Sequence, residues 1–177
     1  MTPKAAERDH VDRFLDEIHL VFPDLDLEVE GIVDRIAGIA RRLHRTMDET
    51  LAEFGLDNAE HKALSVLAQS GAPFRSTPGR LAKRMELSSG AMTNRLDRLE
   101  QAGLIRRLPN ATDRRGVVVE LTEHGHDVYR STVGVQAKKE QLFASALTAR
   151  QRTELNALLR RLMREFERRE QGPADDC

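Results

Sequence analysis

Apolar residues recur along most of the chain at the three- and four-residue steps of amphipathic helices. Two such stretches come first, a short one over Ala5–Phe22 that Pro23 ends and a long one over Leu27–Phe54 that Gly55 ends. The long stretch carries a continuous apolar stripe, which predicts a partner helix that covers it. The stripe consists of Ile32, Ile36, Ile39, Leu43, Met47, Leu51 and Phe54.

A pair of shorter helices is predicted next. Asp57 or Asn58, followed by Glu60, opens the first of them, and Gly71 and Pro73 end it. The inner face of that helix is predicted to be Ala63, Leu64, Leu67 and Ala68. Thr77 before Pro78 is an N-cap followed by proline at the first helical position, so a short helix should run to about Met85 with Leu81 and Ala82 inward.

A further helix is predicted over Ser89–Gln101, because Ser88 can cap it and Gly103 can end it. Met92, Leu96 and Leu99 share one face and should point into the core. The outer faces then carry Thr93, Asn94, Arg95 and Arg98.

Two strand-like segments, Leu104–Leu108 and Val117–Leu121, flank a polar, turn-rich segment over residues 109–116, which predicts a β-hairpin with a basic tip. A helix over roughly His126–Leu147, opened by Thr122, should follow the hairpin. A last helix should begin at the capping box of Thr148 and Gln151, with an apolar stripe at Leu155, Leu158, Leu159, Leu162 and Phe166. The predicted fold is mainly α with a small β-hairpin wing.

Charge is distributed unevenly along a chain whose net charge is −1. Residues 1–30 contain nine acids and three bases, whereas residues 75–115 contain ten bases and four acids. Affinity for nucleic acid rests largely on Lys and Arg that neutralise phosphates. A basic module inside a neutral protein is therefore predicted.

Several functional classes find no support in the sequence. The single cysteine, Cys177, excludes an internal disulfide and a cysteine metal cluster. The six histidines and the scattered serines assemble neither a metal site nor a catalytic triad, so no enzyme, metal or cofactor is expected. An apolar run of about 20 residues and a signal peptide are both missing, so we expect a cytoplasmic protein without a membrane anchor.

The order helix, serine-rich turn, polar-faced helix, strand, basic loop and strand predicts a winged helix-turn-helix between Arg75 and Gly125 that reads double-stranded DNA. The second helix of such a motif lies in the major groove, where Arg and Asn bond guanine and adenine. The candidate DNA-binding residues there are Ser88, Ser89, Gly90, Thr93, Asn94, Arg95 and Arg98. Arg114 and Arg115 at the hairpin tip suit the negative potential of the minor groove.

An alternative from another class is a winged helix that binds protein and reads no DNA. A protein-binding face would favour exposed aromatic and aliphatic side chains. The predicted outer face of Ser89–Gln101 is polar and basic instead, which favours DNA.

These residues resemble the MarR family of bacterial winged helix-turn-helix regulators over about residues 60–126. The segments that carry the resemblance are Leu87–Leu99, Gly103–Arg107, Asp113–Gly116 and Leu121–Gly125. The resemblance implies a homodimer held by the terminal helices and a pseudo-palindromic operator read by two recognition helices. It divides the chain into dimerisation helices at 1–58, a DNA-binding domain at 59–125 and dimerisation helices at 126–170. From the sequence itself, the tail at 171–177 is expected to be disordered.

The resemblance also implies roles for individual residues. Arg115 becomes the side chain inserted into the minor groove, and Asp113 orients the wing by pairing with an arginine. Arg75 and Thr77 become phosphate contacts. Repression, with release by a small, often anionic or phenolic effector, is the implied mode of action. The chain has no tryptophan like that of the urate-responsive subgroup. Its only cysteine, Cys177, departs from the N-terminal cysteine of peroxide-sensing relatives. The effector therefore stays unidentified.

Overall fold

The computed structural model describes residues 8–110 and 116–170. The chain divides into two compact units, residues 1–133 and 134–177, and α6 runs from the first into the second. The helices in the described ranges are α1 (His10–Val21), α2 (Leu27–Glu53), α3 (Asn58–Ala68), α4 (Pro78–Met85), α5 (Ser89–Gln101), α6 (Glu123–Ala144) and α7 (Ala149–Glu170). The strands are β1 (Arg75–Ser76), β2 (Ile105–Pro109) and β3 (Val117–Leu121).

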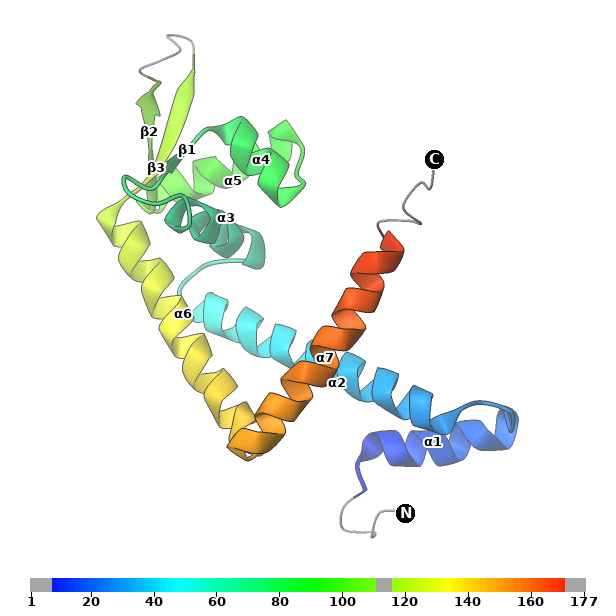
Figure 1. Cartoon of the computed structure of the whole chain (residues 1–177). Helices are drawn as coiled ribbons and strands as arrows, with labels where there is room; N and C mark the ends of the chain where they lie inside the picture. Colours follow the sequence, from blue (N-terminus) through cyan, green and yellow to red (C-terminus); the bar gives the residue numbers. More distant parts are fainter. Residues whose placement is uncertain (1–7, 111–115, 171–177) are drawn as a thin grey trace, which may run out of the picture. The chain divides into compact units, whose positions relative to one another are not determined.

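A winged helix forms the middle of the first unit, with α3, α4 and α5 gathered beside the sheet (Figure 1). The antiparallel sheet has the order β1–β3–β2, and Ile105 of β2 pairs with Leu121 of β3. This arrangement confirms the predicted mainly α fold with a β-hairpin wing. Strand β1 was not predicted, since two residues are too short to show the period-two alternation of a strand.

The predicted inner faces of the three helices form the core. Leu64 and Leu67 of α3, Leu81 of α4 and Met92 of α5 have relative exposures of 1% or less. Burial of each such side chain stabilises the fold by about 1.5–3 kcal/mol. The remaining core members include Leu51, Leu56, Ala63, Met85, Leu96, Leu99, Leu104, Ile105, Val119 and Leu121.

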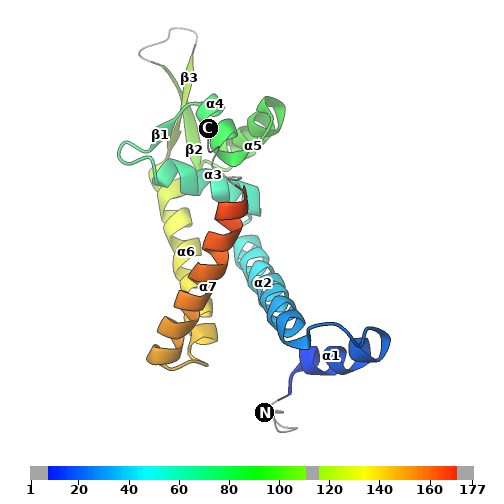
Figure 2. The ribbon, with the colours of Figure 1, turned by 45° about the vertical axis from the view of Figure 1, so that its right-hand side comes forward.

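Helix α1 lies along the N-terminal part of α2 in both views (Figures 1 and 2). Gly31, which is buried, lets the two helices approach: a Cβ built there would lie 3.2 Å from Leu15 Cδ1. Ion pairs hold the start of α1, where Arg35 lies 3.0 Å from Asp9 and 2.7 Å from Asp12.

The predicted starting point of α1 was too early. Asp9 accepts hydrogen bonds from the backbone N–H groups of Val11 and Asp12, and the Asp12 carboxylate accepts one from Asp9 N. This capping box starts the helix at His10 and not at Ala5. Residues 5–7 lie outside the described part of the chain.

The two halves of the apolar stripe on α2 have different surroundings. Leu51 is buried in the winged-helix core, and Met47 and Phe54 pack against it. Ile32, Ile36 and Ile39 in the other half remain 49%, 42% and 40% exposed. The winged-helix core therefore covers the C-terminal half of the stripe, for which a partner helix was predicted.

Helix α6 begins and ends about three residues before the predicted bounds. Thr122 caps it by accepting a hydrogen bond from Gly125 N at 2.9 Å, and it also donates to the carbonyl oxygen of Gly103 at 2.8 Å. A Cβ at Gly125 would lie only 2.0 Å from the carbonyl oxygen of Leu104. The first turn of α6 can therefore approach the α5–β2 connection only because residue 125 is glycine.

Helix α7 is an amphipathic helix of the second unit. Thr148 and Gln151 form the predicted capping box, in which Gln151 N donates to Thr148 Oγ1 at 3.3 Å and Thr148 N donates to Gln151 Oε1 at 2.9 Å. Its apolar side chains are all at least 37% exposed: Leu155, Leu158, Leu159, Leu162, Met163 and Phe166. No helix in the described ranges combines the length and apolarity needed to cross a membrane.

Candidate nucleic-acid interface

The turn between α4 and α5 is set by local capping. The Thr77 side chain accepts a hydrogen bond from Arg80 N at 3.3 Å with Pro78 behind it, which starts α4 as predicted. Glu86 ends α4 in the left-handed conformation, with φ at 56°. Ser88 then caps α5 by accepting a hydrogen bond from Ala91 N at 3.3 Å. Thr77, Glu86 and Ser88 together set the direction in which α5 leaves the turn.

The first two turns of α5 present small and polar side chains to solvent. Ser89, Gly90, Thr93 and Asn94 are all exposed. A Cβ at Gly90 would meet nothing within 4 Å, so the protein's own packing does not require glycine there. The small residue leaves this end of α5 open to close approach by another molecule.

The two arginines of α5 are engaged within the protein. Arg95 Nη1 lies 2.6 Å from Asp57 Oδ1, and Arg98 Nε lies 2.9 Å from Glu60 Oε1. Asp57 caps α3, and the Glu60 side chain is only 4% exposed. Burial favours a raised pKa for the Asp57 carboxyl, but the hydrogen bond from Glu60 N and the Arg95 guanidinium lower it. Both arginines, expected at base edges, are thus placed where they fasten α5 to the start of α3.

Arg75 and Arg106 converge on one buried carboxylate at the sheet. Each donates hydrogen bonds to Glu120, with Arg106 Nε 2.7 Å from Glu120 Oε1. Burial favours a raised pKa for Glu120, but the two guanidinium groups lower it. The Arg75 side chain is still 46% exposed, so it presents positive charge to solvent beside the start of α4.

A third ion-pair cluster, which was not predicted from the sequence, connects the wing to α5. Arg107 on β2 lies 2.6 Å from Asp97 Oδ1 and 2.5 Å from Glu100 Oε2. Its backbone N–H also donates to Glu100 Oε1 at 3.0 Å. The cluster holds the hairpin in a fixed orientation to α5. Opposite charges on the two segments were visible in the sequence, but their proximity was not.

Helix α4 carries exposed cations that belong to the predicted basic module but for which the sequence predicted no individual role. Arg80, Lys83 and Arg84 recur at helical spacing and are exposed. Arg84 Nη2 donates to Gln69 Oε1 at 3.4 Å. That spacing, three and four residues apart, was the available signal that they share a face.

The tip of the wing lies outside the described residues, and so do Asp113, Arg114 and Arg115. The hairpin is described up to Asn110, whose N–H donates to the carbonyl oxygen of Gly116 at 3.0 Å. No group of three or more potential metal ligands occurs within residues 8–110 and 116–170.

Comparisons with known proteins identify the family. A sequence model described as "MarR family" matches residues 56–117. The transcriptional regulator PecS of Dickeya dadantii is 31% identical over 140 residues, which span 79% of this chain and 84% of PecS. The chain belongs to the MarR family. Its relatives are transcriptional regulators and not enzymes.

Two further comparisons concern one relative in sequence and one solved structure. The multiple antibiotic resistance protein MarR of Escherichia coli is 33% identical over 102 residues, which span 58% of this chain and 69% of MarR. The Staphylococcus aureus MepR F27L mutant, solved bound to an oligodeoxyribonucleotide, has a TM-score of 0.62 and 21% identity over 76% of this chain and 97% of MepR. The second likeness shows the fold alone.

Proposed function

We propose that this MarR-family regulator binds a pseudo-palindromic operator as a homodimer, with one α5 helix in each of two major grooves. The exposed N-terminal half of α5 carries the proposal. Ser89, Thr93 and Asn94 supply hydrogen-bonding groups there, and Gly90 permits close approach of the helix to the base pairs. No large hydrophobic side chain is exposed between residues 54 and 110, which disfavours a protein-binding role for this face.

Base readout in this proposal rests on Asn94, Thr93 and Ser89. Arg95 and Arg98 act indirectly, because their contacts with Asp57 and Glu60 set the position of α5. The exposed Arg80 and Lys83 of α4, together with Arg75, supply positive charge for phosphates on the flanking backbone. Thr77 belongs to the same edge, at the N-terminus of α4, where backbone N–H groups favour an anion.

The dimer is proposed from exposed apolar side chains on two helices. Ile32, Ile36 and Ile39 on α2 and the six apolar residues of α7 named above are each at least 37% exposed. Apolar stripes of this kind on soluble proteins mark contact surfaces. A twofold dimer would also place two α5 helices for two operator half-sites, about one turn of DNA apart.

Repression, relief by a small effector and insertion of Arg115 into the minor groove are proposed from family membership. The first two predict derepression of the target genes when the effector accumulates. The third predicts that Arg115→Ala weakens DNA binding, with Asp113 as the residue that orients the loop.

Fluorescence anisotropy with labelled DNA from upstream of the protein's own gene tests the proposed function. We expect saturable binding that weakens steeply between about 50 and 200 mM salt, because phosphate contacts release counterions. An unrelated duplex of equal length serves as the control. Equal affinity for the two duplexes at every salt concentration would refute sequence-specific binding.

A further inference from the structure

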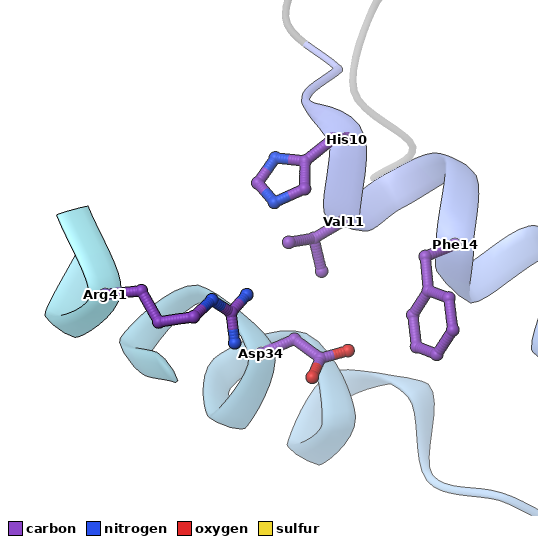
Figure 3. Close-up of a pocket in the computed structure, with 5 residues that line it drawn as sticks. All are labelled: His10, Val11, Phe14, Asp34 and Arg41. Carbon is purple, nitrogen blue, oxygen red and sulfur yellow. The ribbon is translucent and has the colours of Figure 1, made fainter. Parts of the chain in front are cut away.

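A cavity of about 270 Å³ lies between α1 and α2. His10, Val11 and Phe14 of α1 face Asp34 and Arg41 of α2 across it (Figure 3). Ligand pockets in proteins begin at about 300 Å³, so the cavity suits a metabolite of small size.

A buried polar atom in this cavity has no partner. Asp34 Oδ2 is inaccessible to solvent and accepts no hydrogen bond from the described residues. A buried carboxylate oxygen without a donor destabilises a protein by about 1–3 kcal/mol or more. Asp34 as a whole is half-buried and lines the cavity, so rotation of its carboxylate presents a strong acceptor to an incoming N–H or O–H group.

Donors line the same space. Neither Arg41 nor His10 has an ion-pair or hydrogen-bond partner within residues 8–110 and 116–170, and Figure 3 shows both side chains in the space between the helices. Gly38 lies beside both side chains: a Cβ there would be in ordinary contact with them, 3.8 Å from His10 Nε2 and 3.9 Å from Arg41 Nη2. The site thus presents an unpaired cation beside an unpaired anion.

Charge and shape together restrict the ligand. A simple cation would face the Arg41 guanidinium, and a simple anion would face the Asp34 carboxylate. A ligand with both charges satisfies both side chains, and an apolar group can lie against Val11 and the Phe14 ring. We propose that this cavity binds a small zwitterion with an apolar side chain, of the α-amino acid class, with its ammonium group on Asp34 and its carboxylate on Arg41.

The site is compatible with the proposed dimer but does not depend on it. Asp34 and Arg41 each lie two residues from a member of the exposed Ile32, Ile36 and Ile39 stripe, which places them on nearly the opposite side of α2. A ligand held by both helices would strengthen the attachment of α1 to α2.

Isothermal titration calorimetry on the full chain tests the proposal with L-phenylalanine and L-leucine as probes. Phenethylamine lacks the carboxylate, and 3-phenylpropanoate lacks the ammonium group. We expect at least one amino acid to bind with a Kd below about 1 mM and both single-charge compounds to bind at least about tenfold more weakly than phenylalanine. Binding of neither amino acid below that limit, or equal binding of a single-charge compound, would overturn the proposal.

Two variants locate the binding. Asp34→Asn and Arg41→Gln should each weaken amino acid binding by at least about tenfold, whereas Arg45→Gln, one turn further along α2, should leave it unchanged. Circular dichroism checks that each variant is folded, and the His10 imidazole resonances in the NMR spectrum should move on titration of the original protein only. Unchanged affinity in both cavity variants, or unmoved His10 resonances at saturation, would refute this site.

Discussion

Arg95 Nη1 donates hydrogen bonds to both carboxylate oxygens of Asp57, at 2.6 and 2.8 Å. The same carboxylate accepts a hydrogen bond from Glu60 N at 2.8 Å and thereby caps α3. One side chain thus starts the first helix of the winged helix and anchors α5, the proposed recognition helix. The position of α5 depends on a residue that lies before the helix-turn-helix in the sequence.

Replacement of Asp57 should separate its two roles. Asp57→Ala removes the cap and the partner of Arg95, and we expect the free energy of unfolding to fall by about 2 kcal/mol. Asp57→Asn keeps a capping oxygen but removes the charge, so about half that loss is expected. Urea denaturation measures both. Asp26→Ala, which removes the cap of α2, is the control for a lost cap. Equal losses of unfolding free energy in Asp57→Asn and Asp57→Ala would contradict two separate roles for Asp57.

Asn94→Ala should weaken operator binding by about 5- to 150-fold without lowering the thermal stability, because a bidentate base contact contributes about 1–3 kcal/mol. Arg95→Gln should lower the thermal stability and weaken binding to every sequence alike. Anisotropy with the operator and with single-base variants measures both effects. A change of base preference in Arg95→Gln alone would return the readout role to Arg95.

His61 should make the stability depend on pH. Its ring lies 5.4 Å from that of Tyr129, and burial lowers its pKa below the usual 6.5. Its Nε2 atom is buried and has no hydrogen-bond partner in the described part of the chain. Below about pH 6.5 the unfolded chain binds a proton that the folded chain does not, so stability falls as the pH drops. The slope from this residue reaches at most about 1.4 kcal/mol per pH unit.

The pH effect is measured by urea denaturation between about pH 7.5 and pH 5. His61→Gln should flatten the dependence in that range, even if it lowers the stability at every pH. His19→Gln, at an exposed position of α1, should leave the slope unchanged. A slope that is the same in His61→Gln as in the original protein would refute the assignment.

Gly125→Ala should destabilise the protein by about 1–3 kcal/mol or more, because the new Cβ would overlap the carbonyl oxygen of Leu104. Gly134→Ala is the matched control on the same helix, since a Cβ there meets nothing within 4 Å. It should stabilise α6 by about 0.5–1 kcal/mol. Thermal denaturation followed by circular dichroism compares the two, and similar shifts in Tm would contradict the close approach.

Leu158→Asp should dissociate the proposed dimer, because it places a charge in the apolar face of α7. Arg164→Asp, on the opposite face of the helix, is the control and should leave the dimer intact. Sedimentation velocity at several protein concentrations distinguishes monomer from dimer. A Leu158→Asp variant that stays dimeric would exclude α7 as a main contact.

Features that depend on near neighbours could be predicted from the sequence alone. Thr77, Ser88, Thr122 and Thr148 are helix caps as predicted, because a cap bonds backbone groups two or three residues away. Helical periodicity predicted the inner faces for the same reason. The polar outer face of α5 and the family resemblance also follow from this short segment of sequence.

Tertiary structure decided what the charged side chains contact. Arg95 and Asp57 are 38 residues apart, and nothing in the local pattern shows that the guanidinium lies at that cap. Packing between distant segments also pairs Arg75 with Glu120 across β1 and β3 and makes glycine necessary at position 125. It likewise gives the two halves of the α2 stripe different surroundings. Periodicity specifies which face of an element is apolar, but only packing between distant segments specifies which partner that face and its neighbouring charges meet.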